Sequence, residues 1–202
     1  MIKTSHRKLH LLSGRVHPEL AQEVANELGI ELCSLKLGNF ANGEISFRIN
    51  ETVRGSDIFI MQAHAGNIND AIIEQCIMID AAKRASAASI TAVCPYLGYT
   101  RQDRKAGGRE AISGRLVVDM LTAAGADRIM SVDLHSGQTQ GFFNGPFDHL
   151  IARPTLVNAV KAELEGKEVV IVSPDAGRVK SAERYANDLN CGVAIIHKHR
   201  ST

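Results

Sequence analysis

Tryptophan is absent from the 202-residue sequence, and other aromatic residues are scarce, with six Phe and three Tyr. No charge of one sign dominates either, because 23 Lys and Arg face 22 Asp and Glu and leave a formal net charge of +1. Proteins that bind nucleic acids or membrane surfaces through general electrostatics usually carry a stronger basic excess. The composition therefore disfavours a nucleic-acid-binding module, and any phosphate binding has to come from a local cluster of charge.

Cysteine is sparse as well, and no Cys-x-x-Cys pair occurs among Cys33, Cys76, Cys94 and Cys191. This spacing argues against a zinc ribbon and a disulfide framework, so we interpret the cysteines as buried thiols in a reducing compartment. The N-terminal segment lacks the apolar run of a secretory signal, and no apolar run reaches the roughly 18 residues of a membrane span. We predict a soluble, cytoplasmic protein with no membrane partner.

Three common motifs are missing, namely the P-loop, the G-x-G-x-x-G dinucleotide fingerprint and the G-x-S-x-G nucleophile elbow. Short β-branched runs instead alternate with amphipathic stretches of helical length, which is the pattern of a parallel α/β sheet. The predicted strands cover residues 9–13, 31–37, 45–49, 57–62, 90–94, 128–133, 168–173 and 193–197. The predicted helices cover residues 18–28, 112–124, 154–164 and 179–189, and a further helix runs from an N-cap at Asn69 or Asp70 to about Ala85.

Glycine and proline place a domain boundary near residue 150, between Gly145-Pro146 and Arg153-Pro154. We predict a first α/β domain over residues 1–150 and the start of a second over residues 151–202. The second stretch has only a helix–strand–helix–strand pattern, whereas an independent parallel sheet needs several paired strands. It therefore either depends on the first domain or belongs to a truncated unit.

The densest cationic run is Arg101-Gln-Asp-Arg-Lys105, which continues to Arg109. It follows a predicted strand, and ligands of open α/β sheets bind at strand ends. Arginine offers a fork for phosphate, and Gln102 can hydrogen-bond a base edge or a phosphate oxygen. A solvated surface loop is the alternative; the position after a strand and the glycines at 107 and 108 favour ligand binding modestly.

Polar residues also follow three later strands. In an extended chain residues two apart point the same way, so the side chains of Asp133 and His135 would share one side. His135 could contact a metal or a phosphate, or be an ordinary buried histidine. Asp175 could equally hold a cation or cap the next helix. For Lys198 and Arg200, just past the last predicted strand, the alternative is a solvated basic tail.

Five motifs occur together in a fixed order. They are Phe40-Ala-Asn-Gly-Glu44, Pro95-Tyr-Leu-Gly-Tyr-Thr-Arg-Gln-Asp-Arg-Lys105, Asp133-Leu-His-Ser-Gly-Gln-Thr-Gln-Gly-Phe-Phe143, Ser173-Pro-Asp-Ala-Gly177 and Lys198-His-Arg200. With them the chain resembles, from about residue 9 to 200, the N-terminal two-thirds of a ribose-phosphate pyrophosphokinase. The resemblance implies a phosphoribosyltransferase-like parallel sheet domain followed by an incomplete second domain of the same type.

The resemblance also implies roles for single residues. ATP contacts fall to Phe40, Asn42, Gly43, Glu44, Arg101 and Gln102, with Phe40 stacking on adenine. Association with Mg²⁺ falls to His135 and Asp175; because Mg²⁺ prefers oxygen, we expect His135 to act partly through a phosphate or a water. Lys198 and Arg200 match the catalytic basic pair, with Arg200 also at the ribose 5-phosphate.

The implied reaction transfers the β,γ-diphosphoryl group of ATP to the anomeric hydroxyl of ribose 5-phosphate and releases AMP. Such chemistry needs in-line positioning and neutralisation of charge. The resemblance also implies a homohexamer. Two positions depart from the family, Asn42 in place of a frequent Asp and Arg178 in place of a frequent second Gly. The family's ribose-phosphate loop has no counterpart in residues 1–202, so we expect a fragment of the enzyme, or alternatively a non-catalytic, nucleotide-binding associated subunit.

Overall fold

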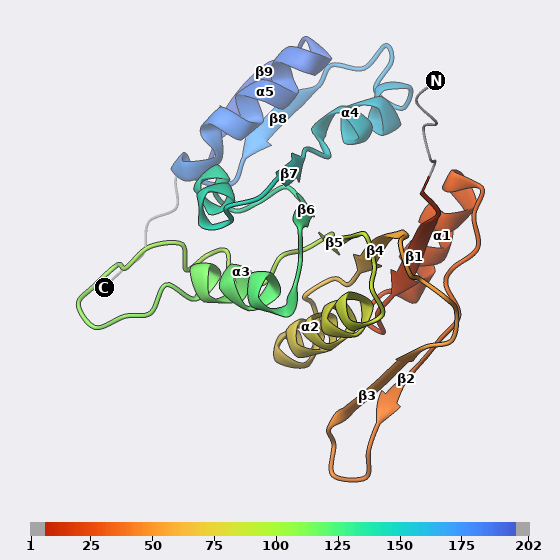
Figure 1. Cartoon of the computed structure of the whole chain (residues 1–202). Helices are drawn as coiled ribbons and strands as arrows, with labels where there is room; N and C mark the ends of the chain where they lie inside the picture. The colour runs from red at the N-terminus through yellow and green to blue at the C-terminus, as the bar shows by residue number, and fades with distance from the viewer. Residues whose placement is uncertain (1–6, 197–202) are drawn as a thin grey trace, which may run out of the picture. The chain divides into compact units, whose positions relative to one another are not determined.

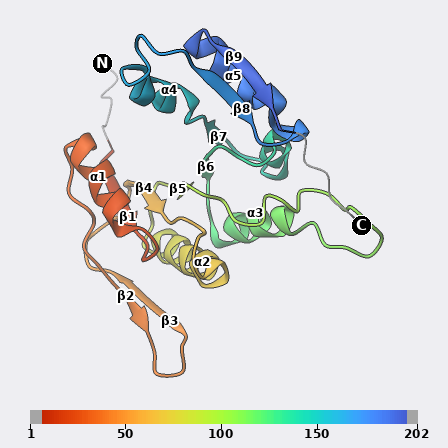
Figure 2. The same ribbon diagram turned by 180° about the vertical axis from the view of Figure 1, so that it is seen from behind.

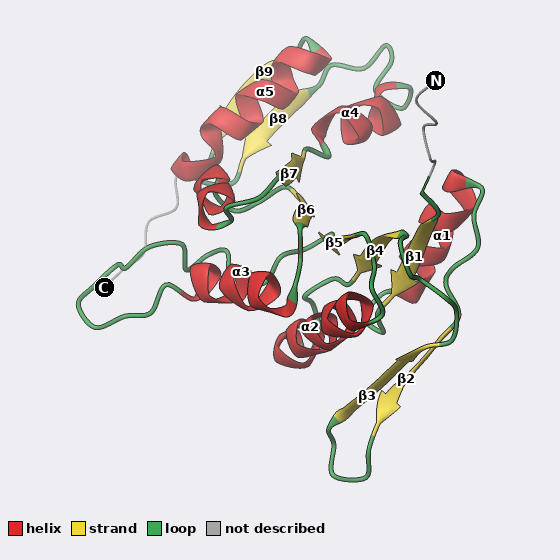
Figure 3. Ribbon diagram, in the orientation of Figure 1, coloured by secondary structure: helices red, strands yellow, loops and turns green. Residues whose placement is uncertain are grey.

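The computed structural model describes residues 7–196 (Figure 1). The chain divides into two compact units, Met1–Leu150 and Ile151–Thr202. Within the described residues the first unit contains a five-stranded parallel sheet and the second a two-stranded parallel sheet, and helices alternate with the strands (Figure 3). The predicted α/β class is therefore confirmed. None of the helices in this part of the chain is long and apolar enough to cross a membrane.

The sheet of the first unit has the strand order β1-β4-β5-β6-β7. Its strands are β1 (Leu9–Ser13), β4 (Asp57–Met61), β5 (Ser89–Cys94), β6 (Arg128–Val132) and β7 (Phe147–Leu150). The first four agree with the predicted strands to within a residue. The edge strand β7 was not predicted, because Phe147-Asp-His-Leu150 is short and half polar; its pairing with β6, Ile129 opposite Phe147, makes it a strand.

The strands present one set of apolar side chains to each face of this sheet. Ile58 and Ile60 of β4 belong to the main core, which the helices α2 (Ile68–Arg84) and α3 (Ser113–Ala124) cover. Phe59 and Met61, the alternate residues, face the helix α1 (Pro18–Leu28) on the opposite side (Figures 1 and 2). The period of two along a strand thus fills both sides of a sheet between helices.

The face that carries α1 is covered only in part. An apolar hollow of about 510 Å³ lies beside the helix, and its walls come from α1, β1 and β4 to β7. They are Leu9, Leu11, Leu20, Val24, Leu28, Phe59, Met61, Val93, Pro95, Met130, Ser131, Val132 and Leu150. One helix is therefore too little to cover this face of a five-stranded sheet.

Between β1 and β4 the chain forms a β-hairpin that extends away from the sheet (Figure 1). Its antiparallel strands are β2 (Leu35–Asn39) and β3 (Ile45–Ile49). The prediction placed the first of these at residues 31–37, which is wrong at its start, because Leu32 forms only an isolated bridge to Leu11. The strand begins where a partner is present, with Leu35 opposite Ile49.

The second unit consists of α4 (Arg153–Lys161), β8 (Val170–Ser173), α5 (Val179–Leu189) and β9 (Gly192–Ile195). Its two strands are parallel, and its buried apolar side chains among the described residues are those of Val157, Ala182 and Ala186. Short 3₁₀ turns at Gly137–Phe142 and Ala176–Arg178 complete the elements of the two units. The predicted cap of α2 at Asn69 or Asp70 is wrong, since the helix begins at Ile68 with Asn67 as its N-cap residue.

Candidate functional site

The loops that follow β1, β4, β5 and β6 all leave the carboxyl edge of the first sheet, where parallel sheets bind ligands. The β1 loop packs closely on the β4 loop, because a Cβ at Gly14 would lie 2.2 Å from Gln62 Oε1. Arg15, the next residue, donates two hydrogen bonds to the Glu74 carboxylate of α2. Its backbone N–H donates to Oε1 at 2.8 Å, and its Nε donates to Oε2 at 2.5 Å. The Glu74 carboxylate is buried, so this pairing balances its charge at the edge of the sheet.

The cationic run lies in the loop between β5 and α3. Arg101, Gln102, Arg104, Lys105 and Arg109 all have exposed side chains. The backbone at the start of the run is fixed: the N–H of Gln102 donates to the Tyr99 carbonyl at 2.9 Å, and the N–H of Gly114 donates to the Gln102 carbonyl at 3.1 Å. The loop therefore presents exposed cationic groups, and its first residues are tied to the start of α3.

A glycine at the start of α3 permits this close approach. A Cβ at Gly114 would lie 3.1 Å from the Tyr99 carbonyl oxygen and 3.3 Å from that of Gln102. Tyr99 itself has a left-handed backbone with φ of 61°, and its hydroxyl donates to Asn69 Oδ1 at 2.5 Å. The turn before Arg101 is thus tied both to α3 and to the start of α2.

A buried histidine, which the sequence analysis did not identify, supports the same loop. The His64 ring is fully buried; its Nδ1 lies 3.1 Å from the Gly98 N–H, and its Nε2 lies 2.8 Å from Gln75 Oε1. Burial lowers the pKa of His64 to about 4, so the ring is neutral, accepts at Nδ1 and donates at Nε2. The Cys94 thiol donates to the same Gln75 oxygen at 3.2 Å. His64 is therefore a positioning residue for the cationic loop, and its one sequence signal is its place just after a strand.

The other predicted ATP-binding residues form the turn of the hairpin. The Phe40 N–H donates to the Glu44 carbonyl at 2.8 Å, and Asn42 Oδ1 accepts the Glu44 N–H at 3.2 Å. Gly43 has a φ of 92°, which favours glycine. The Phe40 side chain is left 59% exposed, and Asn42, Gly43 and Glu44 are exposed too. An exposed ring on a rigid turn is available to stack on a planar ligand.

The two groups of predicted ATP-binding residues lie apart within one chain. In Figures 1 and 2 the hairpin turn and the loop between β5 and α3 project from different sides of the first unit. Arg15 links the hairpin to the sheet edge, since its guanidinium also donates to Asn39 Oδ1 of β2. Asn39 is the last residue of β2, so this contact holds the hairpin beside its turn.

The backbone changes direction after β6, and this overturns one expectation. Asp133 has a φ of 44°, so the Asp133-Leu-His135 segment is not extended and the two-residue rule for side-chain direction does not apply. The Asp133 N–H still pairs with the Leu150 carbonyl at 2.9 Å, and the Leu134 N–H donates to His149 Nε2 at 3.0 Å. His135 is exposed, which excludes the alternative of a buried core histidine.

In the second unit Asp175 caps the turn that leads into α5. Its Oδ1 accepts the Arg178 N–H at 3.1 Å, and its carbonyl accepts the Ser173 hydroxyl at 2.8 Å. The capping alternative is thus present, and the carboxylate is also chemically suited to Mg²⁺, whereas the His135 imidazole is a poorer ligand for that ion. Lys198 and Arg200 lie outside the described residues.

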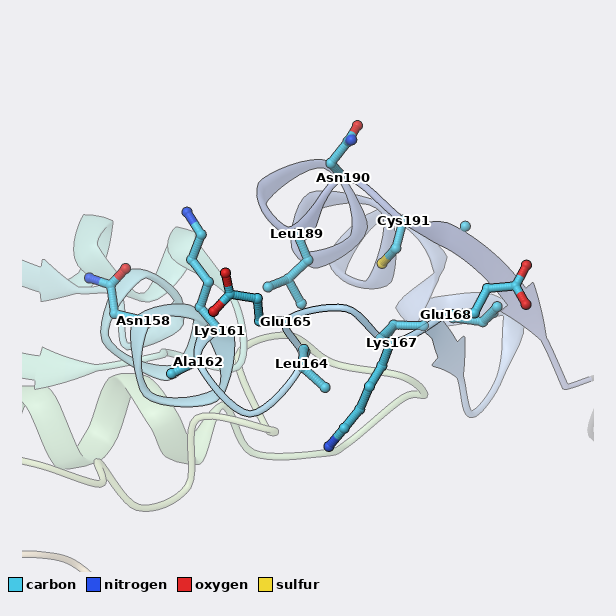
Figure 4. Close-up of a pocket in the computed structure, with 13 residues that line it drawn as sticks. Asn158, Lys161, Ala162, Leu164, Glu165, Lys167, Glu168, Leu189, Asn190 and Cys191 are labelled. Atoms are coloured by element: carbon cyan, nitrogen blue, oxygen red, sulfur yellow. The ribbon is translucent and has the colours of Figure 1, made fainter.

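A large hollow lies elsewhere in the second unit (Figure 4). It measures about 1020 Å³ and is lined by both signs of charge, Lys161 and Lys167 with Glu165 and Glu168. Val170 and Gly192, also in its wall, begin β8 and β9, so the hollow lies at the amino ends of the strands. Because Asp175 follows the carboxyl end of β8, this hollow is not the predicted site.

Comparison with known proteins adds a family match and close relatives. Residues 9–125 match the family described as the N-terminal domain of ribose phosphate pyrophosphokinase. The chain is 56% identical over 197 residues to a ribose-phosphate pyrophosphokinase of Bifidobacterium longum, with 96% of this chain and 58% of that protein covered. The corresponding protein of Streptomyces avermitilis is 53% identical, with 98% and 61% covered.

A solved structure agrees with these relatives. The phosphoribosylpyrophosphate synthetase from Mycobacterium smegmatis superimposes with a TM-score of 0.92 at 50% identity, over 96% of this chain and 66% of that one. The chain thus spans about three-fifths of the length of the two curated relatives.

Proposed function

Because the chain belongs to the ribose-phosphate pyrophosphokinase family, we propose that it binds ATP and takes part in diphosphoryl transfer to ribose 5-phosphate, giving 5-phosphoribosyl 1-diphosphate and AMP. The observation that carries this proposal is the loop at the carboxyl end of β5, where Arg101 and Gln102 are exposed on a backbone held by His64 and Gly114. We assign the ATP motifs to an N-terminal domain, residues 1–150, and residues 151–202 to the start of a second domain.

Each of the proposed ATP-binding residues would make a different contact with the nucleotide. The Arg101 guanidinium offers a two-pronged contact to phosphate oxygens, and the Gln102 amide hydrogen-bonds the nucleotide. The exposed ring of Phe40 stacks on adenine, beside Asn42, Gly43 and Glu44. Since the hairpin turn and the loop between β5 and α3 project from different sides of the first unit, the hairpin of one copy would complete the nucleotide site of another. This supports a homo-oligomer, and we propose the homohexamer.

Mg²⁺ bound with the nucleotide would neutralise charge on the transferred diphosphoryl group. Asp175 has the oxygen chemistry to hold it, and His135 would approach it through a phosphate or a water. The catalytic cations are proposed to be Lys198 and Arg200, with Arg200 also at the ribose 5-phosphate. The free thiols of all four cysteines support a reducing, cytoplasmic location.

Calorimetry of Mg²⁺–ATP binding to the chain, without ribose 5-phosphate, tests the proposal. Arg101→Ala should weaken binding roughly 10- to 100-fold, since a hydrogen bond to a charged group contributes about 1.5–3 kcal/mol. The matched control is Arg84→Ala, an exposed arginine paired with Asp80 on α2. Equal affinity of the two variants, or no binding by the unaltered chain, contradicts the nucleotide site.

An assay of AMP release with ribose 5-phosphate then separates the two functional alternatives. Turnover supports the transferase. ATP binding with no turnover, in the presence of both substrates and Mg²⁺, supports a non-catalytic, nucleotide-binding subunit.

A further inference from the structure

Three potential metal ligands meet at the edge strand β1, in a part of the first unit that the proposed reaction does not use. His10 lies in β1, Cys33 lies between α1 and β2, and Glu51 follows β3. Their ligand atoms, one from each residue, lie within 4.8 Å of one another, and His10 Nδ1 is 3.8 Å from Glu51 Oε2. The topology of the hairpin therefore gathers an N, an S and an O donor from positions far apart in the sequence.

The backbone around this cluster is already fixed. The Cys33 N–H donates to the Leu11 carbonyl at 2.9 Å, which ties the cysteine to β1. The Ser34 N–H donates to Glu51 Oε1 at 2.6 Å, and the Asn50 N–H donates to the Ser34 carbonyl at 2.9 Å. Glu51 therefore uses one oxygen to brace the loop and turns the other toward His10.

The imidazole ring of His10 is buried beside the other two donors, and the residue is only 4% exposed. Its Nε2 has no hydrogen-bond partner among residues 7–196. The nitrogen that faces Glu51 is Nδ1, so a neutral ring with its proton on Nε2 turns the Nδ1 lone pair toward the cluster. Cys33 is buried too, whereas the Glu51 side chain is 37% exposed and leaves a route from solvent.

We propose that His10, Cys33 and Glu51 bind a divalent transition-metal ion, with Zn²⁺ as the best match. Zinc takes nitrogen, sulfur and oxygen ligands at about 2.0–2.3 Å, which separates tetrahedral ligand atoms by roughly 3.3–3.8 Å. The 3.8 Å between His10 Nδ1 and Glu51 Oε2 already falls at the upper end of this range, and the limit of 4.8 Å for the whole cluster requires a contraction of about 1–1.5 Å. Three protein ligands leave the fourth position to a water.

The charges of the cluster fit a cation once the thiol has ionised. Burial raises the pKa of Cys33 to about 11, so the metal has to displace its proton, as metals do at cysteine ligands. The pKa of His10 is lowered by burial, which keeps a lone pair free, and that of Glu51 is lowered by its bond from Ser34. Lys8 is the nearby opposing cation, and two anionic ligands outweigh it.

The location defines what the ion would do. Cys33 precedes β2 and Glu51 follows β3, so the two residues flank the hairpin, and His10 belongs to the sheet. An ion bound by all three would clamp the base of the hairpin to β1. The clamp lies at the opposite end of the hairpin from Phe40, so it acts on hairpin order rather than on the nucleotide contacts.

Titration of the chelator-treated chain with Co²⁺ and Zn²⁺ tests this inference independently of ATP binding. We expect one equivalent of Co²⁺ and a near-ultraviolet thiolate-to-cobalt band, which Cys33→Ser abolishes and Cys76→Ser leaves unchanged. Glu51→Gln should weaken Zn²⁺ binding more than the roughly 10- to 100-fold seen for outer-shell partners. Glu27→Gln, an exposed carboxylate on α1, is the matched control.

Two further results keep the test decisive. Because Glu51 is partly exposed, its variant should fold even if Cys33→Ser does not, and circular dichroism checks both. Zn²⁺ should slow hydrogen exchange of the β2 and β3 amides in the unaltered chain and not in Glu51→Gln. Absence of the cobalt band, or an equal affinity of Glu51→Gln and Glu27→Gln for Zn²⁺, overturns the site.

Discussion

The strands of the two units are similar in sequence and differ in environment. β4 reads Asp-Ile-Phe-Ile-Met and β8 reads Val-Ile-Val-Ser. Ile60 in β4 is 0% exposed, because β1 and β5 flank its strand and the core beneath α2 and α3 encloses its side chain, whereas Val172 in β8 is 51% exposed and Ile195 in β9 is 56% exposed. A β-branched run therefore predicts a strand, but the number of neighbouring elements decides how much apolar area is buried.

This difference in burial predicts that the second unit is less stable than the first. A two-stranded sheet is marginal in water unless other elements cover it, and the second unit buries few apolar side chains beneath α5. The first unit has two apolar clusters, one on each face of its five-stranded sheet, covered by three helices. The following predictions test the contrast, from the largest expected effect to the smallest.

Native-state hydrogen exchange should separate the two units most strongly. Amides of β4 and β5 should exchange only through global unfolding, at about 5–15 kcal/mol, and those of β8 and β9 through local opening at a few kcal/mol. The corresponding difference in protection is roughly a thousandfold or more. Equal protection in β5 and β8 would show that the second unit shares the stability of the first.

Truncation of one side chain in each sheet gives the next contrast. Ile60→Ala should lower the free energy of unfolding by about 2–5 kcal/mol, because it leaves a cavity in a closed core. Val172→Ala should change it by less than about 0.5 kcal/mol, since the side chain is half exposed. Urea unfolding gives the free energy of unfolding of each variant. Similar decreases in the two variants would contradict the contrast in burial.

Mild acid should weaken the first unit alone. Burial lowers the pKa of His64 to about 4, below its value near 6.5 in the unfolded chain. Between these pH values only the unfolded chain binds the proton, so the free energy of unfolding falls as pH drops, by about 3 kcal/mol in all. Urea unfolding from pH 7 to 4 follows the loss.

The matched variants for this titration are His64→Gln and His17→Gln. His64→Gln should remove most of the pH dependence and leave the part due to His10, whose pKa burial also lowers. His17→Gln, on an exposed side chain, should retain the full dependence. Residues 151–196 contain no histidine, so the local opening that exposes the β8 amides to exchange should change little as the histidines of the first unit are protonated. An unchanged slope in His64→Gln would assign the acid effect to another group.

The smallest effect concerns the cap of the second unit. Asp175→Ala should cost about 1 kcal/mol, because it removes the acceptor for the Arg178 N–H, while Asp175→Asn keeps a good capping residue. If Asp175 also holds Mg²⁺, both variants should weaken the Mg²⁺ dependence of ATP binding. A normal Mg²⁺ dependence in Asp175→Asn would leave Asp175 as a cap only.

Much of the fold was predictable because its signals are local. The run 57–62 and the frame of Pro18 and Gly29 mark a strand and a helix, and both are confirmed. The strand β7 depends on β6 as its partner, and the start of β2 depends on β3, so neither is encoded locally.

The candidate site also combines features that the sequence identifies with features that depend on the fold. Motifs identify Arg101 and Phe40, but the separation of the loop between β5 and α3 from the hairpin turn follows from the path of the hairpin (Figures 1 and 2). The left-handed backbone of Asp133 breaks the assumption of an extended chain. His64 positions the cationic loop through its contact with Gly98. This contact joins the segments that follow the neighbouring strands β4 and β5, and no spacing in the sequence reveals it.

The strand order β1-β4-β5-β6-β7 also sets an order of events during synthesis. β4, β5 and β6 each pair with the next strand along the chain, but β1 pairs with β4 across α1 and the whole hairpin. Because β1 is synthesised before the hairpin and β4, it has no partner in the five-stranded sheet until both have emerged. The entropic cost of closing a loop grows slowly with its length, so the segment between β1 and β4 slows the pairing of these two strands but destabilises it little.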